Sequence, residues 1–162
     1  MNEYLHCNAL FTLIDTIEHP LVHPYFNTRK AENVYAVASN VIGDASAPCG
    51  YVNLKVESND SDHLSIGEKN SNIEAFWFGT RYFAGEPLIV PKFGGNLEDE
   101  KDAYLLGMVK DSVKHKSFLA IFDLKKSLNA GPICKLWMKS PIPHGLHGCF
   151  NPMNDALSSY FC

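Results

Sequence analysis

The sequence predicts an all-β fold. Segments rich in β-branched and aromatic residues recur at about 8–12-residue intervals, with clusters of Gly, Pro, Asn, Asp and Ser between them. No long amphipathic helical pattern follows residue 20. Such a succession of short strands is typical of a sandwich, a barrel or a propeller. A length of 162 residues corresponds to one ordinary domain.

The expected elements follow one another along the chain. The first seventeen residues are ambiguous, because Leu10, Leu13, Ile14 and Ile17 have helical spacing and a short amphipathic helix would explain them. The dipeptides at 19–20 and 23–24 are His-Pro, which favours extended or turn backbone. Strands are expected at 34–38, 50–56, 64–66, 73–78, 87–90, 103–109, 117–124 and 133–138, and the acidic run 98–100 is expected in a solvated loop.

Composition excludes several classes of protein. Lys and Arg total 14 against 18 Asp and Glu, a net charge of −4, so a strongly basic nucleic-acid binder is excluded. Hydrophobic residues make up 46% of the chain, which indicates a buried core. The sequence contains no run of about eighteen apolar residues, so no transmembrane helix is expected. Five cysteines at wide spacings indicate free thiols in a reducing compartment.

The most metal-like pattern is the pair His144 and His147, separated by three positions in a glycine-bounded turn. Imidazole suits iron, zinc, copper or nickel, so the residue type does not select a metal. An ordinary turn containing histidines explains the spacing too. A small zinc site of these two histidines with a cysteine is a further alternative.

Two carboxylates lie inside apolar sequence, Glu18 and Glu86. A carboxylate there needs a partner to offset its desolvation. A metal-bound histidine offers one, because its second ring N–H usually donates to a carboxylate. A surface salt bridge or a turn cap is the alternative.

Four stretches, taken in order, resemble the C-terminal part of the carotenoid cleavage oxygenases. They read EHPLVHP (18–24), FAGEPLIVP (83–91), LEDE followed by YLL (97–106), and PIPHGLHGCF (141–150). They are similar to the family segments E-F-P, G-E-P-x-F-V-P, E-E-D-D-G-Y-L and V-P-Y-G-F-H-G-T-F. The resemblance covers residues 18–150, with a non-matching segment at 1–17 and a tail at 151–162. It departs from the first motif at His19, where the family has Phe.

The resemblance implies the C-terminal blades of a seven-bladed β-propeller, present here as an incomplete propeller. Family members bind ferrous iron, Fe²⁺, with four histidines and use O₂ to cleave a conjugated double bond of a carotenoid or apocarotenoid. The last histidine ligand falls at His147, and Glu18 and Glu86 fall at positions that hold iron-bound histidines. His144 falls where the family has Tyr. Phe76, Trp77 and Phe78 would either line an apolar substrate tunnel or pack in the core.

One histidine ligand of four leaves two interpretations of function. The chain is either part of an iron-dependent dioxygenase, inactive when isolated, or a non-catalytic propeller remnant or interaction module. Its expected partners are an apolar polyene and O₂, with no nucleic acid. Peripheral membrane contact is left open, and open sheet edges favour self-association. The sequence leaves localisation undetermined, and the resemblance allows an intracellular site, plastid or cytoplasm.

Overall fold

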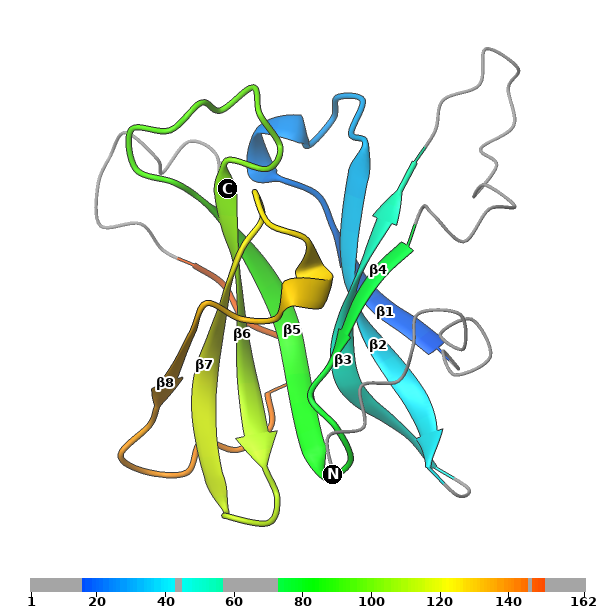
Figure 1. The fold of residues 1–162 in the computed structure, drawn as a ribbon, viewed down its shortest axis with the longest axis vertical. Helices are drawn as coiled ribbons and strands as arrows, with labels where there is room; N and C mark the ends of the chain where they lie inside the picture. Colours follow the sequence, from blue (N-terminus) through cyan, green and yellow to red (C-terminus); the bar gives the residue numbers. More distant parts are fainter. Residues whose placement is uncertain (1–15, 43–44, 57–72, 146, 151–162) are drawn as a thin grey trace.

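The computed structural model describes residues 16–42, 45–56, 73–145 and 147–150, which form two four-stranded antiparallel sheets (Figure 1). The strand orders are β1-β2-β3-β4 and β5-β6-β7-β8. The first sheet contains β1 (Thr16–Leu21), β2 (Asn33–Ile42), β3 (Ala45–Lys55) and β4 (Ile73–Trp77). The second contains β5 (Tyr82–Pro91), β6 (Ala103–Asp111), β7 (Lys116–Asp123) and β8 (Cys134–Trp137). Two short 3₁₀ helices, η2 (Pro24–Phe26) and η4 (Leu128–Ala130), accompany them.

The all-β prediction is confirmed. Within each sheet, every strand pairs with the next along the chain, which is the arrangement of a four-stranded propeller blade. Seven of the predicted strands coincide with observed ones, and the one predicted at 64–66 lies outside the described residues. No helix among the described residues has the length and apolar character needed to cross a membrane.

Two strands differ from prediction. Thr16 and Ile17 belong to β1 and pair with β2, so the helical interpretation is wrong for these two residues, and residues 1–15 lie outside the described ones. A short isolated helix is only marginally stable in water, whereas pairing with β2 satisfies the backbone hydrogen-bonding groups of these residues. β5 begins at Tyr82, five residues before the predicted start, and its first residues pair with the end of β6. Gly85 and Pro87 disguise this strand, because both residue types weaken a strand pattern.

The core lies between the two sheets. β5 lies beside β2 and β3, so the second sheet begins against the first (Figure 1). Tyr51 is fully buried there and makes edge-to-face contacts with Phe78 and Phe122. Phe76 also packs on this cluster, which supports the core interpretation of Phe76 and Phe78. Glycine is required at position 107, because a Cβ there would overlap the Tyr51 hydroxyl.

The acidic run at 98–100 is not wholly solvated, which corrects the sequence prediction for Glu100. Its carboxylate is buried and accepts hydrogen bonds from the backbone N–H groups of Glu32 (2.7 Å) and Asn33 (2.8 Å). The amide of Asn33 donates a third bond to it, at 3.0 Å. Glu100 therefore anchors the β5–β6 loop to the start of β2, since each donor offsets part of the cost of burying the charge.

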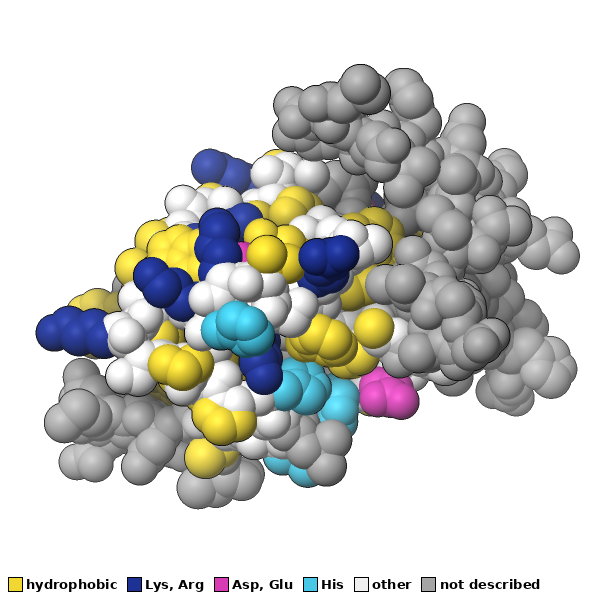
Figure 2. Space-filling model, turned by 90° about the horizontal axis from the view of Figure 1, so that it is seen from below, with side chains coloured by type: hydrophobic (Ala, Val, Ile, Leu, Met, Phe, Trp, Pro, Cys, Tyr) yellow, Lys and Arg dark blue, Asp and Glu magenta, His cyan; other side chains and the backbone are white. Residues whose placement is uncertain are grey.

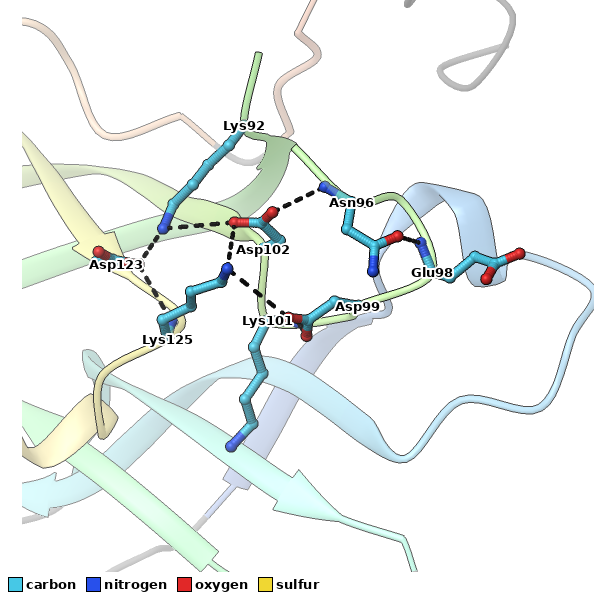
Figure 3. Close-up of polar contacts among 8 residues, drawn as sticks. All are labelled: Lys92, Asn96, Glu98, Asp99, Lys101, Asp102, Asp123 and Lys125. Atoms are coloured by element: carbon cyan, nitrogen blue, oxygen red, sulfur yellow. Dashed lines mark hydrogen bonds and ion pairs between the residues drawn. The ribbon is translucent and has the colours of Figure 1, made fainter. Parts of the chain in front are cut away.

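A second polar network holds the same loop to the end of β7 (Figure 3). Lys92 Nζ lies 2.7 Å from Asp123 Oδ1, and Lys125 Nζ lies 3.0 Å from Asp102 Oδ1. The backbone N–H of Asn96, together with Lys125, lowers the pKa of Asp102, and the bond from Lys92 lowers the pKa of Asp123. Cations and carboxylates thus satisfy one another here.

Candidate metal centre

Backbone irregularities in β1 and β5 bring the site residues together. The β1–β2 register shifts between Glu18 and Leu21, and His19 has a φ of 53°, in the left-handed region. Residues with a Cβ adopt this region rarely. The β5–β6 register shifts between Ala84 and Pro87, on either side of Glu86. Bulges of this kind re-aim a side chain out of the regular alternation of a strand.

Buried contacts hold the bulge in β5. The Tyr51 hydroxyl donates a hydrogen bond of 3.1 Å to the carbonyl oxygen of Gly85. Glycine at this position also permits close approach, because a Cβ would lie 3.2 Å from the Met108 carbonyl and 3.7 Å from the Gly145 carbonyl. The core therefore fixes the residue next to Glu86, and the C-terminal segment lies against it.

Two contacts anchor that C-terminal segment. The buried Ser117 hydroxyl donates to the carbonyl of Ile142 at 2.9 Å and accepts from its N–H at 3.1 Å. Farther along, the N–H of Gly148 donates to Glu86 Oε2 at 2.8 Å. These bonds bring His147 to the Glu86 carboxylate, where His147 Nδ1 lies 3.4 Å from Oε2.

A third side chain, His19, completes a cluster. Its Nδ1 lies 3.9 Å from Glu86 Oε1, and its ring meets the His147 ring edge-on at 5.1 Å between centroids. One nitrogen or oxygen from each of His19, Glu86 and His147 lies within 4.8 Å of the others. Side-chain exposure rises from 19% for His19 and 24% for Glu86 to 68% for His147. Histidine side chains also gather near an acidic one on the face drawn in Figure 2. Imidazole and carboxylate groups together suit a divalent transition metal.

The structure brings together two of the three residues singled out from the sequence, Glu86 and His147. The third, Glu18, is 61% exposed and lies 4.0 Å from His19 Nε2. A role for Glu18 in holding an iron-bound histidine stays a prediction. His144 packs against the Phe83 ring, and the described cluster includes neither it nor Cys149.

Sequence reasoning missed His19 as a member of this cluster. No local spacing relates it to Glu86 or His147, which come from distant parts of the chain. The only signal was its place in the EHP segment, where a histidine stands between a carboxylate and a proline. The β1–β5 contact that unites the cluster is a tertiary one.

A protein-family model described as retinal pigment epithelial membrane protein, RPE65, matches residues 8–152. The apocarotenoid-15,15'-oxygenase of Synechocystis is 34% identical over 131 residues, which cover 81% of this chain and 24% of that protein. The carotenoid 9,10(9',10')-cleavage dioxygenase 1 of Pisum sativum is 25% identical over 136 residues, which cover 83% of this chain and 24% of that protein. The chain thus spans about a quarter of the length of these curated relatives.

Solved structures give the same result. The cobalt-substituted Synechocystis apocarotenoid oxygenase aligns with a TM-score of 0.63 and 28% identity, over 81% of this chain and 24% of that one. A chimera of the Synechocystis oxygenase and RPE65, carrying D477G, aligns with a TM-score of 0.64 and 27% identity, over 83% and 25%. The two sheets therefore correspond to part of a larger propeller structure.

Proposed function

Since the chain belongs to the family of RPE65 and the carotenoid cleavage oxygenases, we propose that it serves as the C-terminal part of an iron(II)-dependent dioxygenase. The reaction is oxidative cleavage of a conjugated double bond of a carotenoid or apocarotenoid, in which each carbon of the bond ends as a carbonyl. The observation that carries the proposal is the contact between Glu86 and His147. By the family motifs, His147 stands at the position of the last iron-binding histidine, and Glu86 stands at the position of a glutamate that holds such a histidine.

The donor set fits this role for one ligand. His147 Nδ1 faces the Glu86 carboxylate at 3.4 Å, so a proton on Nδ1 leaves Nε2 as the lone-pair nitrogen for a metal. The His147 ring is exposed, so a metal ion bound to it can also bind imidazoles from outside this chain. Those residues must supply the other histidine ligands of the iron. The bound iron would supply the redox chemistry with O₂.

The protein's own groups position that imidazole. The Gly148 N–H holds one oxygen of Glu86, so the carboxylate presents a fixed acceptor to the ring. The Tyr51 bond to Gly85 holds the backbone of the bulge from the core side. Loss of such supporting partners typically lowers metal affinity or activity by about 10–100-fold.

A non-catalytic role is the second candidate. It is favoured by the single expected iron ligand that the motifs identify in this sequence, His147, where the family resemblance implies four histidines. In that role the two sheets would serve as an interaction module.

A chimera tests the proposal. Residues 18–150 would replace the matching quarter of the Synechocystis apocarotenoid oxygenase, in the manner of its chimeras with RPE65. We expect the chimera to bind iron and cleave an apocarotenoid, and His147→Ala to abolish both. His144→Ala is the matched control, because His144 lies two positions beyond Ile142 on the same segment and outside the cluster. A folded chimera that binds no iron would refute the catalytic assignment.

A further inference from the structure

The cluster of His19, Glu86 and His147 lies wholly within this chain. We propose that the chain by itself binds one divalent metal ion of the zinc or cobalt kind, with two imidazoles and one carboxylate as ligands. This site goes beyond the proposed function, because it uses His19 and makes Glu86 a direct ligand. It needs no residue from outside the chain.

The spacing of the groups suits such an ion. Zinc bonds of about 2.0–2.2 Å in tetrahedral geometry place neighbouring ligand atoms roughly 3.3–3.6 Å apart. His147 Nδ1 and Glu86 Oε2 are 3.4 Å apart, which is already within this range. His19 Nδ1 lies 3.9 Å from Oε1, so a closure of about half an ångström suffices there. All three ligand atoms lie within 4.8 Å of one another, so small side-chain rotations suffice to gather them around one ion.

The two ring nitrogens of His19 are oriented for metal binding. His19 directs Nδ1 toward Glu86, while its Nε2 lies 4.0 Å from the Glu18 carboxylate. A second-ring N–H that faces a carboxylate is the usual support for a metal-bound histidine. At 4.0 Å the two groups are too far apart for a hydrogen bond, and Glu18 would support the ring only after its exposed side chain moves closer. The ligand set carries one negative charge and leaves a solvent-facing position open, as in catalytic His₂Glu zinc sites.

The backbone conformation of His19 also supports a metal-binding role. Its φ of 53° is a left-handed conformation that costs free energy in a residue with a Cβ. The bulge turns the ring inward, to 19% exposure, while the preceding Glu18 stays at 61%. The strained residue is therefore the one whose ring meets both Glu86 and His147. It is also the residue at which the chain departs from the E-F-P motif.

The two metal roles use opposite nitrogens of His147. In the iron role Nδ1 is protonated against Glu86 and Nε2 binds the metal. In the site proposed here Nδ1 is the ligand, since it is the nitrogen that faces the carboxylate. Experiments can therefore separate the two roles.

Titration of the purified chain with Co²⁺, followed by visible absorption, and with Zn²⁺, followed by calorimetry, tests the site. We expect one ion per chain. His19→Phe should weaken binding by at least about 100-fold, because loss of a ligand exceeds the 10–100-fold effect of losing a supporting partner. His19→Gln is the second variant, and far-ultraviolet circular dichroism establishes that both remain folded.

Two matched controls test the competing zinc site. His144→Ala and Cys149→Ser should leave the affinity unchanged, because neither residue is in the described cluster. Binding that survives in folded His19→Phe, or is lost in either control, would overturn the proposal. So would the absence of binding to the wild-type chain. In the oxygenase chimera His19→Phe should retain iron, so failure of this site and failure of the proposed function are distinguishable.

Discussion

Substitution of Tyr51 by Phe tests the link between the core and the site. The hydroxyl donates 3.1 Å to the Gly85 carbonyl, and the side chain is fully buried. Phe preserves the ring and its contacts with Phe78 and Phe122. The change thus removes one hydrogen bond and leaves a buried carbonyl without its donor.

Tyr51→Phe should lower both the stability and the metal affinity of the protein. A buried group left unpaired costs about 1–3 kcal/mol in the free energy of unfolding. At about 2–4 °C per kcal/mol for a domain of this size, a loss of about 2 kcal/mol lowers Tm by about 4–8 °C. Release of the bulge next to Glu86 should also weaken Co²⁺ binding by about tenfold, the lower end for a supporting partner.

Thermal unfolding followed by circular dichroism, with a parallel Co²⁺ titration, measures both effects. Tyr104→Phe is the matched control, because this half-buried ring lies near Lys92 on the outer side of β6 and should change stability by less than about 0.5 kcal/mol. Equal melting temperatures for the two variants would refute the reasoning. An unchanged Co²⁺ affinity in Tyr51→Phe would show that the bulge does not depend on this bond.

Three further predictions concern stability and association. The Lys114 backbone N–H lowers the folded-state pKa of Asp111, so its contribution is present above about pH 4 and is lost as pH falls through that lowered pKa. Urea unfolding from pH 6 to pH 2.5 should therefore show a shallower loss in Asp111→Asn, and parallel curves would contradict this. Gly50→Ala places a Cβ 2.5 Å from the Phe76 carbonyl oxygen and should cost about 1–3 kcal/mol by chemical unfolding, and a neutral effect would mean that the strands shift freely. Leu136, 49% exposed on the edge strand β8, should promote self-association, so Leu136→Lys should lower the sedimentation coefficient at tens of micromolar. A monomeric wild-type chain at that concentration would contradict the prediction.

The strands were predictable because their signals are local. β6 alternates buried and half-buried residues along its whole length, and its hairpin to β7 has a polar turn. The start of β5 was not predictable, because Gly85 and Pro87 interrupt the pattern at the bulge. The burial of Glu100 was hidden as well, since its donors lie on β2 and just before it, more than sixty residues away.

Part of the candidate site was also predictable from the sequence, and part was not. Glu86 and His147 were recognisable from motifs that resemble a family, and the structure places them 3.4 Å apart. His19 was not, because its role depends on a left-handed backbone and on the packing of β1 against β5. Strain and long-range contact of this kind leave no periodic signal in a sequence.

The native polypeptide that carries this sequence provides the most direct test of the dioxygenase assignment. An antibody against residues 86–147 would isolate it, and its intact mass and bound iron would then be measured. The chain covers 24% of its relatives, so the account predicts a polypeptide roughly four times the 18.1 kDa of this chain, carrying one iron. A native species of 18.1 kDa without iron would contradict the assignment and favour the interaction module.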